Sequence, residues 1–199
     1  MKIKSLNLIL NDYCNSICNM CKIWKNNSKN ELTAKDIESL SRKDEFSSVE
    51  EISLSGGEPL LVKNIDQIID MSTALFPSIK RIFLNHNGTR PEKAEELVKK
   101  YAERTPEFYL CISIDGSKEL NDSIRGIPSF DKAVKTLELC TNLHIANYKQ
   151  IISATIQKKN SGFDNLEYLI NLANNTGSEF SFRFVAEAQN YYQNVGVTE

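Results

Sequence analysis

The chain has 199 residues, of which 41% are hydrophobic and 25% charged, and its formal net charge is −2. This balance is ordinary for a globular protein and predicts one domain over residues 1–199. It excludes the strongly basic surface typical of nucleic-acid-binding proteins. No apolar run approaches the roughly 20 residues that span a membrane, and no signal-peptide pattern follows Met1. We therefore expect neither nucleic acid nor a membrane as a partner.

Strand and helix patterns alternate along the chain. Strands are predicted at 3–10, 51–55, 80–84, 108–114, 149–157 and 179–185, and helices at 34–46, 64–76, 91–104, 130–143 and 164–176. The helices are indicated by apolar residues three or four positions apart, as at Ile65, Ile68 and Ile69. This alternation predicts parallel βα units, arranged either as an open doubly wound sheet or as a barrel. In both architectures a functional site lies at the carboxyl ends of the strands.

The loop after the first predicted strand holds Cys14, Cys18 and Cys21, spaced C-x3-C-x2-C. Three thiolates can bind three irons of a cubane cluster and leave the fourth iron open for a small molecule. A structural zinc site needs a fourth ligand, and both histidines are distant in sequence. Disulfides within so short a loop would leave an odd thiol. The loop therefore indicates an iron–sulfur site, whereas Cys111 and Cys140 are interpreted as buried packing residues.

Short motifs follow the second, third and fourth predicted strands, which places them at the same end of the sheet. They are Ser55-Gly56-Gly57-Glu58-Pro59, Asn85-His86-Asn87-Gly88 and Ser113-Ile114-Asp115-Gly116. Paired glycines allow a ligand to approach the backbone closely. Ser113 and Asp115 are expected to project to one side of an extended chain. Each motif alone is compatible with an ordinary turn, but beside the cysteine loop they indicate a single site.

The cysteine spacing and these motifs resemble the radical S-adenosylmethionine (radical SAM) family over nearly the whole chain. The resemblance implies an α/β fold of the (β/α)6 partial TIM barrel type. It also implies a [4Fe–4S] cluster on Cys14, Cys18 and Cys21, with S-adenosyl-L-methionine (SAM) on the open iron. Enzymes of this family cleave SAM reductively to a 5′-deoxyadenosyl radical, which abstracts hydrogen from a substrate. An oxygen-sensitive cluster fits a reducing, cytoplasmic compartment.

The resemblance further implies a set of residues that contact SAM. They are Met20, Gly56, Gly57, Glu58, Asn87, Ser113, Asp115, Arg125 and Ser153. Met20 stands where the family often has an aromatic residue near the adenine. Glu58 is expected either to contact SAM or to support its own loop. Ser153 and Thr155 alternate with apolar residues in their predicted strand, which suggests a wet barrel interior.

Three charged or polar positions leave alternatives open. Arg125 either pairs with the SAM carboxylate or holds its loop through Asp115 or Asp122. His86 stands where the family usually has Thr, and it either faces the substrate or packs within the structure. Arg183, on the last predicted strand, either lines the cavity or points to solvent.

Within the family, the motifs look most like enzymes of the SPASM and molybdenum-cofactor-biosynthesis type. Those relatives continue into a C-terminal domain with auxiliary clusters, whereas no cysteine follows Cys140 here. The resemblance implies an enzyme that acts on a peptide, a protein side chain or a small metabolite, with an electron donor such as flavodoxin or ferredoxin. The other function class is a non-catalytic iron–sulfur or SAM-binding scaffold, or a fragment that needs a partner domain.

Overall fold

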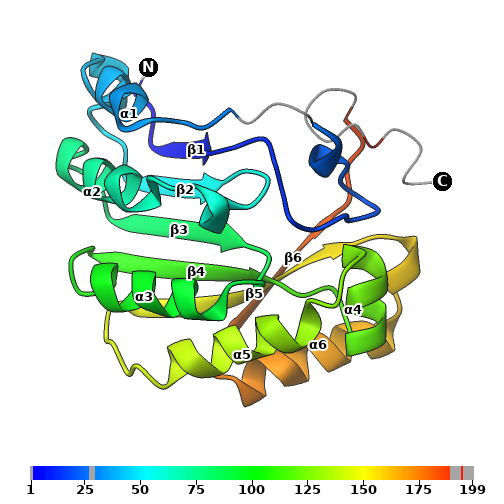
Figure 1. Ribbon diagram of the computed structural model, residues 1–199. Coiled ribbons are helices and arrows are strands. Elements are labelled where there is room, and N and C mark those ends of the chain that lie inside the picture. Colours follow the sequence, from blue (N-terminus) through cyan, green and yellow to red (C-terminus); the bar gives the residue numbers. More distant parts are fainter. Residues whose placement is uncertain (1, 27–29, 189–193, 195–199) are drawn as a thin grey trace.

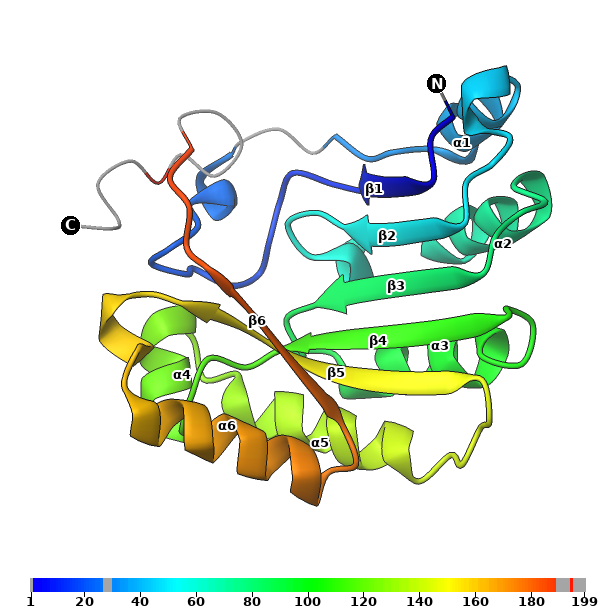
Figure 2. The same cartoon turned by 180° about the vertical axis from the view of Figure 1, so that it is seen from behind.

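A computed structural model describes residues 2–26, 30–188 and 194. Its six strands are parallel and form one sheet in the order β1-β2-β3-β4-β5-β6, so each strand pairs with its neighbours in sequence. Helices cover one face of this sheet, and β6 crosses obliquely on the other face, behind β5 in Figure 1 and in front of it in Figure 2. The α/β fold predicted from the sequence, a partial barrel of six βα units, is confirmed. No helix in the described ranges is long and apolar enough to cross a membrane.

The strands and helices lie close to their predicted positions. The strands are β1 (Ser5–Ile9), β2 (Glu51–Ser55), β3 (Arg81–His86), β4 (Glu107–Ser113), β5 (Tyr148–Ile156) and β6 (Glu179–Phe184). The α-helices are α1 (Ala34–Ser41), α2 (Ile65–Leu75), α3 (Pro91–Tyr101), α4 (Lys118–Arg125), α5 (Phe130–Thr141) and α6 (Phe163–Asn175). Short 3-10 turns are η1 (Ile23–Lys25), η2 (Asp44–Phe46), η3 (Pro59–Leu61) and η4 (Lys158–Asn160).

Two differences from the prediction concern helices. The first helix ends at Ser41 and the chain continues into η2, whereas the sequence predicted one helix over 34–46. Helix α4 was not predicted at all, because its residues were interpreted as a loop motif. It is only eight residues long, and Leu120 and Ile124 are its only strongly apolar side chains. The irregular tail expected after 185 lies mostly outside the described residues.

Side chains alternate along the strands between a face of the sheet that is buried in the hydrophobic core (the dry face) and a face that lines a polar cavity (the wet face). In β2, Leu54 is fully buried in the main core, whereas Ser53 and Ser55 line a cavity on the opposite face. In β5, Ser153 and Thr155 line the same cavity. The wet interior predicted from the sequence of β5 is therefore confirmed.

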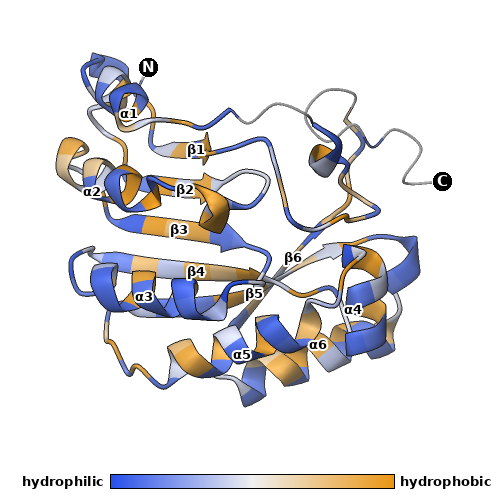
Figure 3. Ribbon diagram, in the orientation of Figure 1, coloured by the Kyte–Doolittle hydropathy of each residue, from blue (hydrophilic) through white to orange (hydrophobic). Residues whose placement is uncertain are grey.

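The helices form because their sequences place an apolar stripe against the dry face. Helix α3 begins at Pro91, whose fixed backbone suits a first helical turn, and it buries Ala94, Leu97 and Val98. Each large aliphatic side chain buried in this way contributes about 1.5–3 kcal/mol relative to an exposed one. The helices are consequently amphipathic, and both hydrophilic and hydrophobic residues are seen along each of them (Figure 3).

Candidate cofactor site

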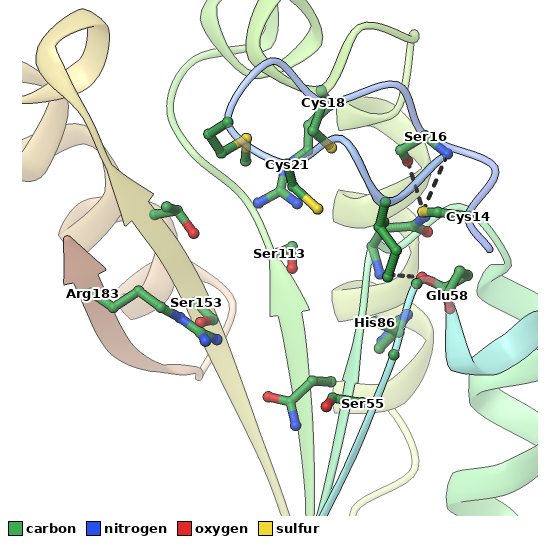
Figure 4. A pocket seen from close by; sticks show the side chains of 18 of the residues that line it. Cys14, Ser16, Cys18, Cys21, Ser55, Glu58, His86, Ser113, Ser153 and Arg183 are labelled. Atoms are coloured by element: carbon green, nitrogen blue, oxygen red, sulfur yellow. Dashed lines mark hydrogen bonds between the residues drawn. The ribbon is translucent and has the colours of Figure 1, made fainter. Parts of the chain in front are cut away.

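A cavity of about 390 Å³ lies on the wet face, where the strands end in loops. Eleven of the twelve residues assigned to the site from the sequence line it. They are Cys14, Cys18, Met20, Cys21, Gly56, Gly57, Glu58, Asn87, Ser113, Arg125 and Ser153. Several of them are shown in Figure 4. The structure therefore brings together motifs that are spread over roughly 140 positions of the sequence, as expected when parallel strands share one carboxyl end.

The three loop cysteines point toward a common part of this cavity (Figure 4). The Cys14 sulfur accepts hydrogen bonds from the Ser16 backbone N–H at 3.4 Å and from the Asn87 side-chain amide at 3.8 Å. Burial raises the pKa of the Cys14 thiol to about 12, and burial also raises the pKa of Cys18 and Cys21. All three thiols are therefore protonated at neutral pH in the metal-free chain and release their protons when they bind a metal.

The donor set of three thiols fits three irons of a cubane cluster. In a cubane each thiolate binds a different iron, so the three sulfurs surround the cluster and do not meet at one centre. Neutral N–H donors beside Cys14 suit a thiolate in such a cluster.

Helix α4 holds the cysteine loop from one side. The backbone N–H of Ile17 donates to the carbonyl of Arg125 at 3.1 Å, and that of Asn19 donates to the carbonyl of Ile124 at 3.0 Å. The Asn19 side chain also donates to the carbonyl of Ser123 at 3.0 Å. The last turn of a helix leaves such carbonyls without partners inside the helix, and here they receive the loop.

The two glycines after β2 pack directly against the chain that leads into the cysteine loop. The Gly57 N–H donates to both the carbonyl and the side-chain oxygen of Asn11, each at 3.0 Å. A β-carbon on Gly57 would lie 1.9 Å from the carbonyl oxygen of Tyr13. Gly56 has a φ of +153°, which side-chain-bearing residues rarely adopt. The glycines are thus required by contact with β1 and its loop, a reason that the sequence did not supply.

Glu58 supports its loop, which was one of the two expected alternatives. It is buried, and its two carboxylate oxygens accept hydrogen bonds from the backbone N–H of Leu60 at 3.0 Å and of Asn87 at 2.8 Å. Burial raises its pKa to about 7. Because both oxygens already bind the backbone, Glu58 connects the loop after β2 to the loop after β3.

Asn87 connects the loop after β3 to the cysteine loop. Its side-chain N–H groups donate to Asn15 Oδ1 at 2.8 Å and to Ser16 Oγ at 3.0 Å. Its oxygen accepts a hydrogen bond from the Thr89 backbone at 3.0 Å. Asn15 and Ser16 were not identified from the sequence, because no spacing or periodicity marks residues whose partners are more than seventy positions away.

The expectation that Asp115 shares the cavity with Ser113 is wrong. Ser113 lines the cavity, whereas Asp115 is fully buried and lies outside the lining. β4 ends at Ser113, so the alternation of an extended chain does not continue to Asp115. Asp115 Oδ1 instead accepts a hydrogen bond from the Thr155 backbone at 2.8 Å, and Oδ2 lies 2.7 Å from Arg125 Nε. For Arg125, the alternative that the structure displays is the ion pair within the protein.

Two further side chains of uncertain direction line the cavity. Arg183 projects into it from β6 (Figure 4) and is not directed only to solvent. His86 is buried, and its Nδ1 accepts a hydrogen bond from the Gly88 N–H at 3.1 Å. Burial lowers the pKa of His86 to about 3, so the imidazole is neutral with its proton on Nε2. Cys111 and Cys140 are buried away from the cysteine loop, as predicted.

Comparison with known proteins assigns the family. The Radical SAM superfamily matches residues 8–157, so the chain belongs to this superfamily. Proteins of this superfamily bind a [4Fe–4S] cluster and SAM. The resemblance stated from the cysteine spacing and the strand-end motifs is thereby confirmed.

Two curated relatives and one solved structure show how far the similarity extends. Mycofactocin maturase MftC of Mycobacterium tuberculosis is 34% identical over 113 residues, which are 55% of this chain and 26% of that protein. GTP 3′,8-cyclase of Clostridium botulinum is 28% identical over 178 residues, which are 86% of this chain and 53% of that protein. Streptococcus suis SuiB bound to S-adenosylmethionine has a TM-score of 0.77 at 21% identity and covers 96% of this chain and 43% of SuiB. The chain thus spans at most about half the length of these proteins.

Proposed function

We propose that Cys14, Cys18 and Cys21 bind the [4Fe–4S] cluster and that SAM lies across the same cavity. The observation that supports this most directly is the shared lining: the three sulfurs, the glycine pair and the polar ends of β4 and β5 all face one space. When bound, the reduced cluster and SAM together supply a 5′-deoxyadenosyl radical that abstracts hydrogen from a substrate.

The residues of this chain bind and orient these groups. The backbone at Gly56 and Gly57 lines the cavity, so its peptide groups can face the methionine end of SAM. Ser113 and Ser153 offer hydroxyl groups at the ends of neighbouring strands, which suit the polar groups of SAM. Met20, Ile23 and Trp24 supply an apolar part of the wall beside the cysteine loop, which suits the adenine.

We infer further that the substrate is a peptide or a protein side chain. MftC is a maturase by name, and SuiB has been solved bound to the precursor peptide SuiA. GTP 3′,8-cyclase, however, acts on a nucleotide, so a small metabolite is the competing outcome. The electron donor in this proposal is a flavodoxin or ferredoxin, and the compartment is reducing because the cluster is sensitive to oxygen. Residues 1–199 are proposed to be the core domain of this activity.

The proposal is tested by anaerobic reconstitution with iron and sulfide, followed by chemical reduction in the presence of SAM. We expect the parent chain to bind one four-iron cluster and to form 5′-deoxyadenosine. Cys18→Ala should lose the visible absorption and the EPR signal of the cluster, because a three-thiolate site has no spare ligand. Cys140→Ala, which changes a buried cysteine of the main core, should keep both signals. Full iron and sulfide retention in Cys18→Ala would contradict the assignment.

The substrate class is tested separately from cofactor binding. Candidate peptides and GTP, each deuterated at non-exchangeable carbons, are supplied to the reconstituted enzyme. Transfer of deuterium into 5′-deoxyadenosine from a peptide, but not from GTP, is the expected result. SAM cleavage without deuterium from any peptide, together with transfer from GTP, would reject the peptide proposal and leave the cofactor assignment intact.

A further inference from the structure

Asn194 makes contacts that none of the motifs accounts for. It is 1% exposed and lines the cavity, although it lies far from every predicted site residue in sequence. Its side-chain Nδ2 donates to the carbonyl of Met20 at 2.8 Å and to the carbonyl of Ala186 at 3.0 Å. Its Oδ1 accepts a hydrogen bond from the Ala188 N–H at 2.7 Å. Both N–H groups and the oxygen of the amide are therefore used within the protein.

The carbonyl that Asn194 binds lies in the centre of the cysteine loop. Met20 stands between Cys18 and Cys21 in sequence, and its side chain packs in a small buried cluster with Cys18 and Ile124. Val185, the residue after β6, packs against the same cluster, and its N–H donates to the carbonyl of Ile156 at 2.8 Å. The chain after β6 thus reaches the cysteine loop through the packing of Val185 and through the hydrogen bond from Asn194 to Met20.

The contact between Asn194 and the cysteine loop lies between the two edges of the sheet, which are not joined into a closed barrel. β1 and β6 are the two edges of the sheet and do not pair with each other. In Figures 1 and 2, the orange-red chain that follows β6 runs beside the blue loop that follows β1. The cysteine loop is therefore held by the end of α4 on one side and by Asn194 on the other.

We propose that Asn194 is a positioning residue that fixes Met20, and through Met20 the wall of the SAM site beside the cluster. The inference rests on the proposed function, because it assumes that the loop binds the cluster and that SAM lies against Met20. It requires a primary amide: two carbonyls need two donors, and the Ala188 N–H needs an acceptor. A carboxylate in the same place satisfies the acceptor role but faces two carbonyl oxygens without a donor.

The test compares Asn194→Asp and Asn194→Ala with the parent in the full chain after anaerobic reconstitution. Asn194→Asp is nearly isosteric, but it removes the two donors and places a negative charge against the carbonyl oxygens of Met20 and Ala186, whereas Asn194→Ala removes the whole amide. We expect both variants to bind one cluster, because no thiolate changes. SAM affinity should fall by roughly three- to tenfold, which is the effect of losing one neutral hydrogen bond in the wall. The SAM-induced change in the EPR spectrum of the reduced cluster should shrink in parallel.

A matched control is Asn175→Ala, which changes an exposed asparagine at the end of α6. It should keep the parent's SAM affinity and EPR change. Parent-like SAM affinity and EPR change in both Asn194 variants would overturn the proposal, as would a loss in Asn194→Ala that Asn194→Asp does not share. If the parent chain binds neither cluster nor SAM, the proposed function itself is rejected. If the parent binds SAM and the Asn194 variants bind it equally well, only the role of Asn194 is rejected.

Discussion

Asp115 Oδ2 and Arg125 Nε lie 2.7 Å apart in a buried ion pair that joins the end of β4 to the last turn of α4. Burial lowers the pKa of Arg125, but attraction to Asp115 and Cys18 outweighs this effect and the pKa lies above its usual range. Because α4 receives the cysteine loop through the carbonyls of Ile124 and Arg125, the pair fixes the support of the candidate cluster site.

Breaking this pair should destabilise the metal-free chain strongly. Arg125→Ala leaves the carboxylate of Asp115 buried without its partner, which should cost about 4 kcal/mol. The measurement is urea denaturation of the metal-free protein. The control is Lys118→Ala, which breaks the exposed ion pair between Lys118 of α4 and Asp131 of α5 and should cost less than about 1 kcal/mol. Equal, small effects of the two changes would show that the buried pair does not hold α4.

Gly57→Ala should disturb the entry to the cysteine loop. The new β-carbon would meet the Tyr13 carbonyl oxygen at 1.9 Å, so the backbone must move. The structure directs a side chain at Gly57 toward the chain that follows β1. We therefore expect a lower unfolding midpoint and weaker cluster retention, not weaker SAM binding alone.

The matched control for this change is Gly162→Ala. Apart from its two chain neighbours, no described residue has an atom within 4 Å of the β-carbon that it would add, and its backbone is extended. Circular dichroism melts of the metal-free chains and iron analysis after reconstitution compare the two variants. A Gly57→Ala protein that melts like the parent and keeps all its iron would show that the backbone at Tyr13 can move without loss of stability or of the cluster.

The sequence predicted the strands and the gathering of the motifs, because these follow from local periodicity and from the geometry of parallel sheets, whereas the partial barrel was implied by the family resemblance. It did not predict α4, since eight mostly polar residues carry little periodicity. It also placed Asp115 on the wrong side, because alternation holds only while the strand continues and β4 ends at Ser113. This error concerns Asp115 alone, but it replaces an expected contact with SAM by an ion pair with Arg125.

Sequence patterns did not predict the hydrogen bonds that hold the loops together. Asn11 binds the Gly57 backbone, Asn87 binds the cysteine loop, and Asn194 binds Met20. Each is a hydrogen bond between segments distant in sequence, and asparagine is also common in plain turns. Only the folded chain distinguishes an asparagine that joins two loops from one that ends a strand.

Glu58 should give the metal-free chain a distinctive pH dependence. Its pKa is raised from 4.5 to about 7 in the folded state by burial. A raised carboxyl pKa contributes stability that is present below about pH 4.5 and lost as the pH rises through about 7, by up to about 3 kcal/mol. Glu58→Gln does not titrate, so the unfolding free energy of the variant relative to the parent should increase over this window. A pH-independent difference between the two proteins would contradict the raised pKa.

His86 should have the opposite effect in the same protein. Burial lowers its pKa from 6.5 to about 3, so the folded state keeps the imidazole neutral. The stability associated with the neutral ring is complete above about pH 6.5 and is lost toward acid, at about 1.4 kcal/mol per pH unit. His86→Gln should therefore lose less stability than the parent between pH 6.5 and 5. Urea titrations of both proteins at fixed pH values measure the difference, and parallel profiles would refute a neutral buried histidine.

The last prediction concerns Ser113, because it separates a SAM site from a fold that only binds a cluster. Ser113 ends β4 and lines the cavity beside Ser153 of β5, whereas the neighbouring Asp115 is buried in its ion pair. If SAM extends from the cluster toward β4 and β5, Ser113→Ala removes one neutral hydrogen bond and should lower SAM affinity by roughly three- to tenfold.

Iron content should stay unchanged in Ser113→Ala, because the hydroxyl is not a ligand in the proposed site. The control is Ser181→Ala, since Ser181 pairs in register with Ser153 but is exposed on β6 and lies outside the cavity lining. SAM affinity and 5′-deoxyadenosine formation are measured for both variants after anaerobic reconstitution. If Ser113→Ala equals the parent in both measurements, SAM does not reach β4, and the proposed path of SAM across the cavity is wrong.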